Sequence, residues 1–229
     1  MSERRTPLSR DRVLRAALDL VDGEGVEALT MRRLGRELGV EAMSLYGYVE
    51  NKHDLIEGVV EQVFREMPLI GPGPGLWQDR IRRHAATYRA VLLAHPNVVR
   101  LVGGRPLVTE GTARFVESAL AELCGVGLDL ATADRVLGVV AAFTLGQVAE
   151  QVGDSARAAA GGPPPGGRDD GAIDAARFPR LAAIGAMKPA DYDRQFDLGM
   201  DFIVGGMERL LGEHSPGPAD PSGWDRIVG

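Results

Sequence analysis

The segment from residue 30 to residue 56, TMRRLGRELGVEAMSLYGYVENKHDLI, constrains the fold of this chain more than any other stretch. Thr30 can cap a short helix with its hydroxyl, and Leu34 and Leu38 lie four residues apart, so they share one face of that helix. Gly39 fits the sharp turn that follows a helix C-terminus. Two short helices joined by a glycine-containing turn are typical of a helix-turn-helix, whose second helix enters the DNA major groove.

The second short helix of this segment predicts a surface that reads DNA. Leu45 and Val49 are expected to point inward, which leaves polar and aromatic side chains on the outer face. A helix that only supports the fold rarely exposes two tyrosines, a serine and a methionine together. We therefore predict DNA contacts from Arg32, Met43, Ser44, Tyr46, Tyr48 and Lys52. The alternative is a helical hairpin that exposes aromatic residues without binding DNA.

The same residues resemble the DNA-binding segment of the TetR family of transcriptional regulators. The stretch LTMRRLGRELGVEAMSLYGYVENKHDL matches that segment almost position by position, including Leu45–Tyr46 and Asn51–Lys52. The second half of the chain resembles the tetracycline-repressor type of C-terminal domain through WQDRIRRHAATYRAVLL, GGRP at 103–106, AAFTLGQVAEQ at 141–151 and FDLGMDFIVGGMERLL. The resemblance implies a homodimeric repressor that a small, largely apolar effector releases from its operator DNA.

Helical periodicity runs through the whole chain, and no stretch alternates in the manner of a strand. Residues 4–10 indicate a mobile basic arm, and PLIGPGPG at 68–75 is a helix breaker that marks a boundary. We therefore predict an all-α fold with four parts: an N-terminal three-helix helix-turn-helix DNA-binding domain over 1–51, a connecting helix over 52–67, a larger helical ligand-binding and dimerisation domain over 68–213 with a mobile loop at 160–175, and a disordered tail over 214–229.

Two helices of the second part carry more apolar surface than one core needs. The helix at 131–158 is apolar nearly all round along its middle, so it must be buried on several sides. The last helix, 191–212, has one stripe that fits a core and further apolar residues, Leu198 and Phe202, on its other side. In the resembled branch these two helices form a four-helix bundle across a two-fold axis, so we predict a homodimer through them.

The resemblance also implies a small-molecule cavity in the C-terminal part. Its lining would be apolar with a few convergent polar groups, the usual form of such a site, and comprises Arg80, His84, Tyr88, Leu101, Arg105, Phe143, Gln147 and Glu150. Branch members that take metal-chelated tetracycline have histidines where Leu101 and Ala142 stand here. We therefore predict a different effector and assign no metal ligand and no cofactor, while the presence of a metal with the effector stays open. His84 and Tyr88 fit equally an internal hydrogen-bonded pair, and Glu150 fits equally a surface or interface charge.

The composition is that of an ordinary soluble globular protein, with 45% hydrophobic and 25% charged residues. No apolar stretch reaches the roughly 18 residues that span a membrane. The N-terminus is polar, and the single cysteine, Cys124, fits a reducing compartment. We therefore predict a cytoplasmic protein with no membrane partner. A net charge of -6 does not exclude DNA binding, because phosphate contacts depend on local clusters of arginine and lysine.

Signals for an enzyme are weak. The four histidines lie on different predicted elements without metal-ligand spacing, and GGPPPGG has prolines where a phosphate-binding loop needs free backbone amides. No Ser or Cys lies in a nucleophile motif, so we predict no enzymatic activity. The alternative function is a helical small-molecule carrier or sequestering protein with a vestigial helix-turn-helix. Only Gly47 supports that alternative, because the resembled family often has a larger or basic residue there.

Overall fold

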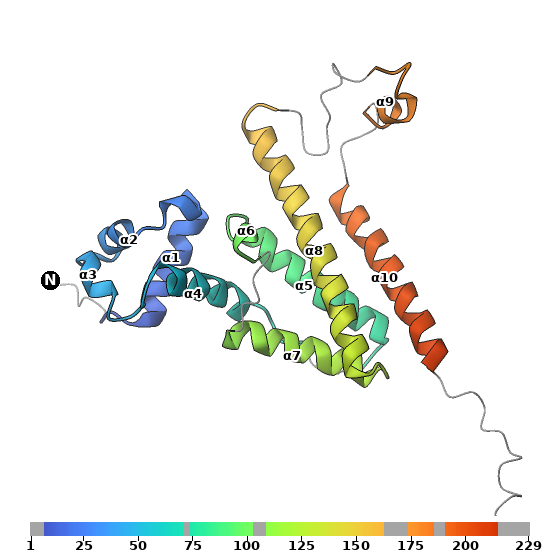
Figure 1. Ribbon diagram of the computed structural model, residues 1–229, viewed down its shortest axis with the longest axis horizontal. Coiled ribbons are helices and arrows are strands. Elements are labelled where there is room, and N and C mark those ends of the chain that lie inside the picture. Colours follow the sequence, from blue (N-terminus) through green and yellow to red (C-terminus); the bar gives the residue numbers. More distant parts are fainter. Residues whose placement is uncertain (1–6, 71–73, 103–108, 163–173, 186–190, 215–229) are drawn as a thin grey trace, which may run out of the picture.

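The computed structural model describes residues 7–70, 74–102, 109–162, 174–185 and 191–214. Within these ranges every regular element is a helix, so the predicted all-α fold is confirmed (Figure 1). In chain order the elements are α1 (Arg10–Glu24), the short 3₁₀-helix η1 (Val26–Ala28), α2 (Met31–Leu38), α3 (Ala42–Leu45), α4 (Lys52–Arg65), α5 (Trp77–Ala94), α6 (Val99–Val102), α7 (Glu110–Gly125), α8 (Leu130–Ala159), α9 (Pro179–Gly185) and α10 (Tyr192–His214).

The helices α1 to α3 form a head whose helix ends are set by local hydrogen bonds. The side chain of Ser9 accepts a hydrogen bond from the Arg12 amide ahead of α1, and Thr30 accepts one from the Arg33 amide ahead of α2. Gly39 ends α2 in a left-handed conformation, with φ of 66° and ψ of 35°. The turn brings α3 against α2 over a core of the buried residues Val13, Ala17, Val21, Leu29, Leu34 and Leu45.

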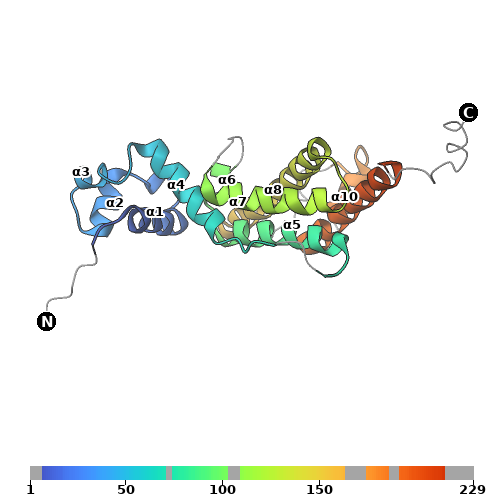
Figure 2. The same ribbon diagram turned by 90° about the horizontal axis from the view of Figure 1, so that it is seen from below.

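The helix α4 joins this head to the rest of the molecule and shares a core with both (Figure 2). Near its middle, Gly58 lets α1 approach so closely that a Cβ at this position would overlap Leu14. Near its end, the ring centroid of Phe64 lies 6.1 Å from that of Tyr88 and 6.1 Å from that of Phe115. One hydrophobic core therefore continues from the head into the C-terminal helices.

A polar contact around His95, at the end of α5, also ties the head to the rest of the molecule. Its Nδ1 lies 2.7 Å from Asp22 of α1, and its Nε2 lies 3.0 Å from Glu66 at the end of α4. Asn97 donates hydrogen bonds to the carbonyls of Val21 and Asp22. Burial acts to lower the pKa of His95, but the hydrogen bonds to the two carboxylates and their negative charges outweigh it and raise the pKa. The imidazole thus bridges the ends of α1 and α4 through both ring nitrogens.

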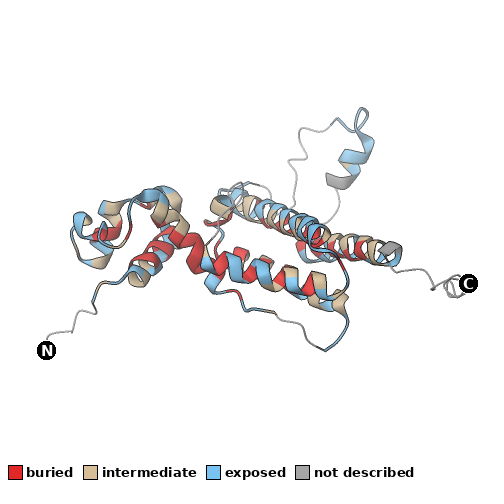
Figure 3. Ribbon diagram, turned by 60° about the horizontal axis from the view of Figure 1, so that its bottom comes forward, coloured by how far each residue is buried: buried red, intermediate tan, exposed pale blue. Residues whose placement is uncertain are grey.

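The C-terminal part is built from α5, α7, α8 and α10, whose buried faces pack on one another (Figures 1 and 3). The core between them comprises Ile81, Ala85, Leu123, Val136, Val140, Phe196, Met200, Val204 and Met207. By length and composition alone α8 could cross a membrane, so the expectation that no stretch reaches that length was wrong. Only 28% of its most apolar window is buried, because its outer face packs on no other described helix.

Several predicted features fall outside the described residues: the start of the basic arm, Arg105 with the GGRP motif, most of the loop at 160–175, and the tail from residue 215. Arg10, where the sequence predicted both the end of the basic arm and the start of a helix capped by Ser9, is the first residue of α1. The sequence did not predict α9, because its seven residues are too few to show a clear apolar periodicity.

Candidate nucleic-acid interface and ligand cavity

The side chains predicted to read DNA lie around α2 and α3, at the end of the molecule farthest from α10 (Figure 2). Met43 of α3 is 75% exposed, and Tyr46, in the turn that follows, is 48% exposed. Ser44, Arg32 and Lys52 are exposed as well. No carboxylate in the described part of the chain pairs with Arg32 or Lys52, so both cations are available to phosphates.

Tyr48 differs from the other predicted DNA-binding residues. It is half-buried and packs against the core of the head. The helix α3 is a single turn that ends at Leu45, and residues 46–48 form a turn rather than the longer helix that we predicted. Gly47 lies in this turn, and glycine disfavours helix because it loses the most backbone freedom on folding. A base contact by Tyr48 stays a prediction, but its ring already has a packing role.

A small apolar cavity of about 130 Å³ lies among α4, α5, α7 and α8. It is lined by Phe64, His84, Ala85, Tyr88, Phe115, Val116, Ala119, Leu137, Val140 and Ala141. His84 is 5% exposed, and neither ring nitrogen makes a hydrogen bond of normal geometry within the described ranges. Burial lowers the pKa of His84, although the charge of Glu122 and the carbonyl of Ile70 act in the opposite direction. The ring is therefore neutral at pH 7.

Tyr88 gives the cavity its second polar group. Burial raises the pKa of Tyr88 to about 12, so the hydroxyl stays protonated and can donate a hydrogen bond. The ring centroids of His84 and Tyr88 each lie 6.0 Å from that of Phe115. Phe64 and Phe115 complete the aromatic wall, and an apolar stripe in a sequence does not show that two rings border an empty space.

The structure does not bring the other predicted ligand-binding residues into this cavity. Arg80 donates from Nε to Glu122 at 2.6 Å, and the Glu122 side chain is 1% exposed. Leu101 is half-buried on α6, and Glu150 is exposed on α8. Arg105 lies outside the described residues. The buried ion pair of Arg80 gives that residue a structural partner that the sequence did not predict.

Phe143 and Gln147 are also placed elsewhere, against α10. The ring of Phe143 stacks on Phe196, with ring centroids 5.7 Å apart. Gln147 donates a hydrogen bond to the carbonyl of Tyr192 at 2.8 Å. The reason is helix geometry: Ala141 faces the cavity, and a residue two positions later points about 200° away around the helix. The prediction that these two side chains line the cavity is therefore not supported.

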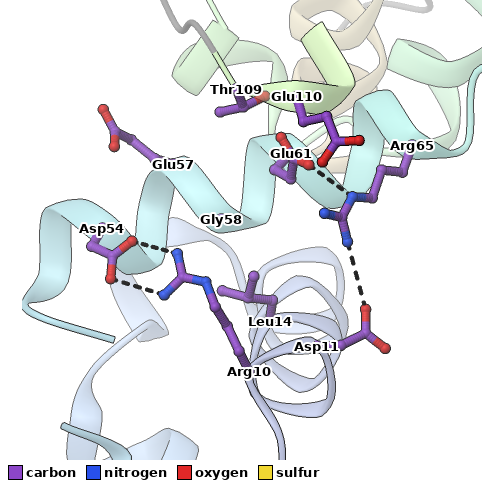
Figure 4. Close-up of a pocket in the computed structure, with 10 residues that line it drawn as sticks. All are labelled: Arg10, Asp11, Leu14, Asp54, Glu57, Gly58, Glu61, Arg65, Thr109 and Glu110. Carbon is purple, nitrogen blue, oxygen red and sulfur yellow. Dashed lines mark hydrogen bonds and ion pairs between the residues drawn. The ribbon is translucent and has the colours of Figure 1, made fainter. Parts of the chain in front are cut away.

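A polar cleft of about 420 Å³ lies between α1 and α4, beside the start of α7 (Figure 4). Two ion pairs cross it, one between Arg10 and Asp54 and one between Arg65 and Asp11, the second at 3.9 Å. Glu61 is buried between them and accepts from Arg65 at 2.7 Å. Figure 4 shows both arginines reaching across the cleft to the opposite helix. No group of three His, Cys, Asp or Glu in the described ranges could hold a metal ion.

Comparison with known proteins identifies the family. Residues 13–59 match the family model for bacterial regulatory proteins of the tetR family, and residues 70–211 match the model for the tetracyclin repressor-like C-terminal domain. The chain belongs to the TetR family of transcriptional regulators. The first match ends inside α4, which places the first half of that helix with the DNA-binding head of this TetR family member.

The chain matches known regulators over most of their length. The tetracycline repressor protein class A from transposon 1721 of Escherichia coli is 32% identical over 223 residues, which cover 93% of this chain and 97% of the relative. An HTH-type transcriptional regulator of Saccharopolyspora erythraea is 31% identical over 206 residues, or 90% and 86% of the two chains. The TetR family protein ActR of Streptomyces coelicolor in complex with actinorhodin has a TM-score of 0.79 at 28% identity, over 92% of this chain and 100% of ActR.

The predicted resemblance is thus confirmed for both halves of the chain. This TetR family member is a DNA-binding transcriptional regulator with a helix-turn-helix in its head. Its relatives are regulators, and none of the names compared above describes an enzyme.

Proposed function

We propose that this regulator is a cytoplasmic, homodimeric repressor and that a small, largely apolar effector releases it from operator DNA. The observation that carries the proposal is the position of α4. Lys52 at its start is exposed beside the helix-turn-helix, and Phe64 near its end forms part of the cavity wall. One helix therefore connects the cavity to the surface that we expect to meet DNA.

The cavity indicates what kind of effector would fit. Its walls are almost entirely apolar, and neither nitrogen of the buried His84 ring makes a hydrogen bond of normal geometry in the described part of the chain. A neutral imidazole offers one donor and one acceptor, so an apolar compound with at least one hydroxyl or carbonyl group would satisfy it. The volume of about 130 Å³ is smaller than a ligand of drug size requires, so binding must displace part of the wall.

Displacement of the wall explains how an effector would act at a distance. Phe64 is the wall residue that belongs to α4, and α4 packs against α1 of the head. A dimer must hold its two recognition helices about 34 Å apart, or a multiple of that distance, to meet successive major grooves. An effector that binds better when the helices take another spacing shifts the population toward it. Operator DNA must weaken effector binding by the same factor.

The outer faces of α8 and α10 support the homodimer. A groove of about 550 Å³ runs between them, lined by Val139, Phe202, Leu210 and their neighbours. Phe202 is 72% exposed and Val139 is 56% exposed. Contiguous apolar surface of this kind marks an interaction site more often than chance. The family resemblance implies a bundle of these two helices across a two-fold axis, so we propose that a second copy of this chain covers the groove.

The DNA-binding part of the proposal is tested with the DNA upstream of the protein's own gene. We expect specific binding that weakens by roughly 1–3 kcal/mol in each of Tyr46→Ala and Arg32→Ala, the scale of one direct base contact. Lys52→Ala should weaken binding to all DNA alike and reduce the salt dependence, because it removes a phosphate contact. Fluorescence anisotropy at several salt concentrations measures both effects. Unchanged operator affinity in Tyr46→Ala and Arg32→Ala together would reject this assignment.

The effector part is tested by screening apolar compounds for those that raise the melting temperature. The best compound is then titrated into the protein–operator complex. We expect release of DNA by the wild type and a weaker response in His84→Leu, which keeps a large apolar side chain but has no ring nitrogens. A compound that binds tightly to a protein without any operator affinity would instead support the carrier alternative.

A further inference from the structure

Arg10 and Asp54 form a double hydrogen bond between the first turn of α1 and the first turn of α4 (Figure 4). The Arg10 Nη2 atom donates to one carboxylate oxygen at 2.5 Å, and Nη1 donates to the other at 3.0 Å. Nη1 also donates to the backbone carbonyl of Tyr48 at 2.6 Å. One guanidinium thus holds both the connecting helix and the backbone that leaves α3.

The Asp54 carboxylate holds the same stretch of backbone from the other side. It accepts a hydrogen bond from the Glu50 amide at 2.8 Å. Asn51 caps α4 by accepting hydrogen bonds from the amides of His53 and Asp54. The connection from α3 to α4, residues 46–51, is therefore held at Tyr48 by Arg10 and at Glu50 by Asp54. The amides of Tyr48 and Val49 also donate to the carbonyl of Leu45, so this stretch is tied to the end of α3 as well.

The charges of Arg10 and Asp54 are paired with each other at the junction of α1 and α4. The hydrogen bond from Arg10 is the largest of the effects that lower the pKa of Asp54, so the carboxylate is ionised at neutral pH. Asp54 in turn holds the guanidinium between α1 and α4, in the cleft of Figure 4. Arg10 is also exposed, with 49% of its side chain accessible, but it differs from Arg32 and Lys52 because a carboxylate pairs with its guanidinium.

We infer that Arg10 and Asp54 are positioning residues for operator recognition, an inference that rests on the proposed DNA binding. They set where the end of α3 and its following turn lie relative to α1 and α4, and so where Met43 and Tyr46 point. Base contacts need side chains placed to within about half an ångström, whereas attraction to phosphates tolerates larger displacements. Loss of the clamp should therefore reduce specific binding much more than nonspecific binding.

Asp54→Asn gives the sharpest test, because the two explanations predict opposite changes in the affinity for operator DNA. The substitution removes a negative charge near DNA, so electrostatics alone would tighten binding to every sequence. If the clamp positions the recognition surface, affinity for the operator should instead fall roughly tenfold, the scale of one mismatched base pair. Affinity for random DNA of the same length should rise or stay unchanged. Fluorescence anisotropy on both DNAs gives the ratio of the two affinities.

Two further variants complete the experiment. Arg10→Lys keeps the positive charge but cannot donate two parallel hydrogen bonds, so we expect a smaller fall in the same ratio. Arg15→Ala is the matched control: Arg15 is also an ion-paired arginine of α1, its partner is Asp11, and its variant should keep the wild-type ratio. Circular dichroism verifies that each variant is folded. If Asp54→Asn does not fold, the affinity ratio of Arg10→Lys tests the inference in its place.

The outcomes separate this inference from the proposed function. The inference is wrong if folded Asp54→Asn binds the operator as tightly as the wild type or more tightly, or if it loses specific and nonspecific affinity by the same factor. It is also wrong if Arg15→Ala lowers the ratio as much as the clamp variants do. If the wild type itself shows no preference for its operator, the proposed function fails rather than the role of the clamp within it.

Discussion

Truncation of Phe202 should dissociate the proposed dimer, and the structure sets the size of the effect. Phe202 is 72% exposed on α10 in the protomer, so most of its ring remains to be buried by a partner. Full burial of a phenylalanine side chain stabilises by roughly 1.5–3 kcal/mol, and a two-fold axis applies the change twice. Phe202→Ala should therefore weaken the dimer by roughly 2–4 kcal/mol, which raises its dissociation constant by about 30- to 1000-fold.

Sedimentation equilibrium from nanomolar to micromolar concentration measures this constant directly. Leu69→Ala is the matched control, because Leu69 is also a large exposed apolar residue, at 49%, but does not line the groove of α8 and α10. Operator affinity should fall in parallel with dimerisation in Phe202→Ala and remain unchanged in Leu69→Ala. A wild-type monomer at micromolar concentration, or a Phe202→Ala dimer as tight as the wild type, would refute the proposed interface.

Two further predictions concern stability. Because its carboxylate partners raise the pKa of His95 in the folded protein, its stabilising effect should be complete below the unfolded value of about 6.5 and disappear as pH rises through the folded value. The melting temperature should accordingly fall with rising pH in that window, and calorimetry should show a smaller fall in His95→Gln; an identical pH profile for both proteins would contradict this. Gly199→Ala should destabilise by roughly 1–3 kcal/mol in chemical denaturation, because the new methyl group overlaps the ring of Phe143. Gly205→Ala should leave the free energy of unfolding nearly unchanged, because no described atom outside its own helix lies within 4 Å of the added methyl group. An equal loss of stability in the two variants would show that helix packing at Phe143 is looser than the structure indicates.

The sequence determined the helix ends of the head and the exposed side chains around α3. Thr30 and Asn51 accept hydrogen bonds from amides two or three residues later, and Gly39 takes the left-handed turn between α2 and α3. Met43 and Tyr46 are exposed as the apolar pattern predicted. Each of these features depends on residues within one or two turns of each other, so the order of residues is enough to set it.

The sequence also predicted two apolar sides on α10, but it could not say what each side of α8 would face. Ala141 and Phe143 are two residues apart in one apolar run, yet the first lines the cavity and the second stacks on Phe196 of α10. When a helix is apolar nearly all round, periodicity no longer distinguishes its faces. Of the ligand-binding residues carried over from the family, His84 and Tyr88 therefore line the cavity, whereas Phe143 and Gln147 pack against α10.

Only the tertiary structure showed which distant side chains meet. Arg10 and Asp54 are 44 residues apart, and nothing in the local pattern of either predicts the clamp that they form. His95 and its two carboxylate partners come from three helices in the same way. Hydrogen bonds within a turn follow from the order of residues, because the backbone brings those atoms together in any helix. Contacts between helices depend instead on crossing angles and rotations, which the packing of many side chains decides together.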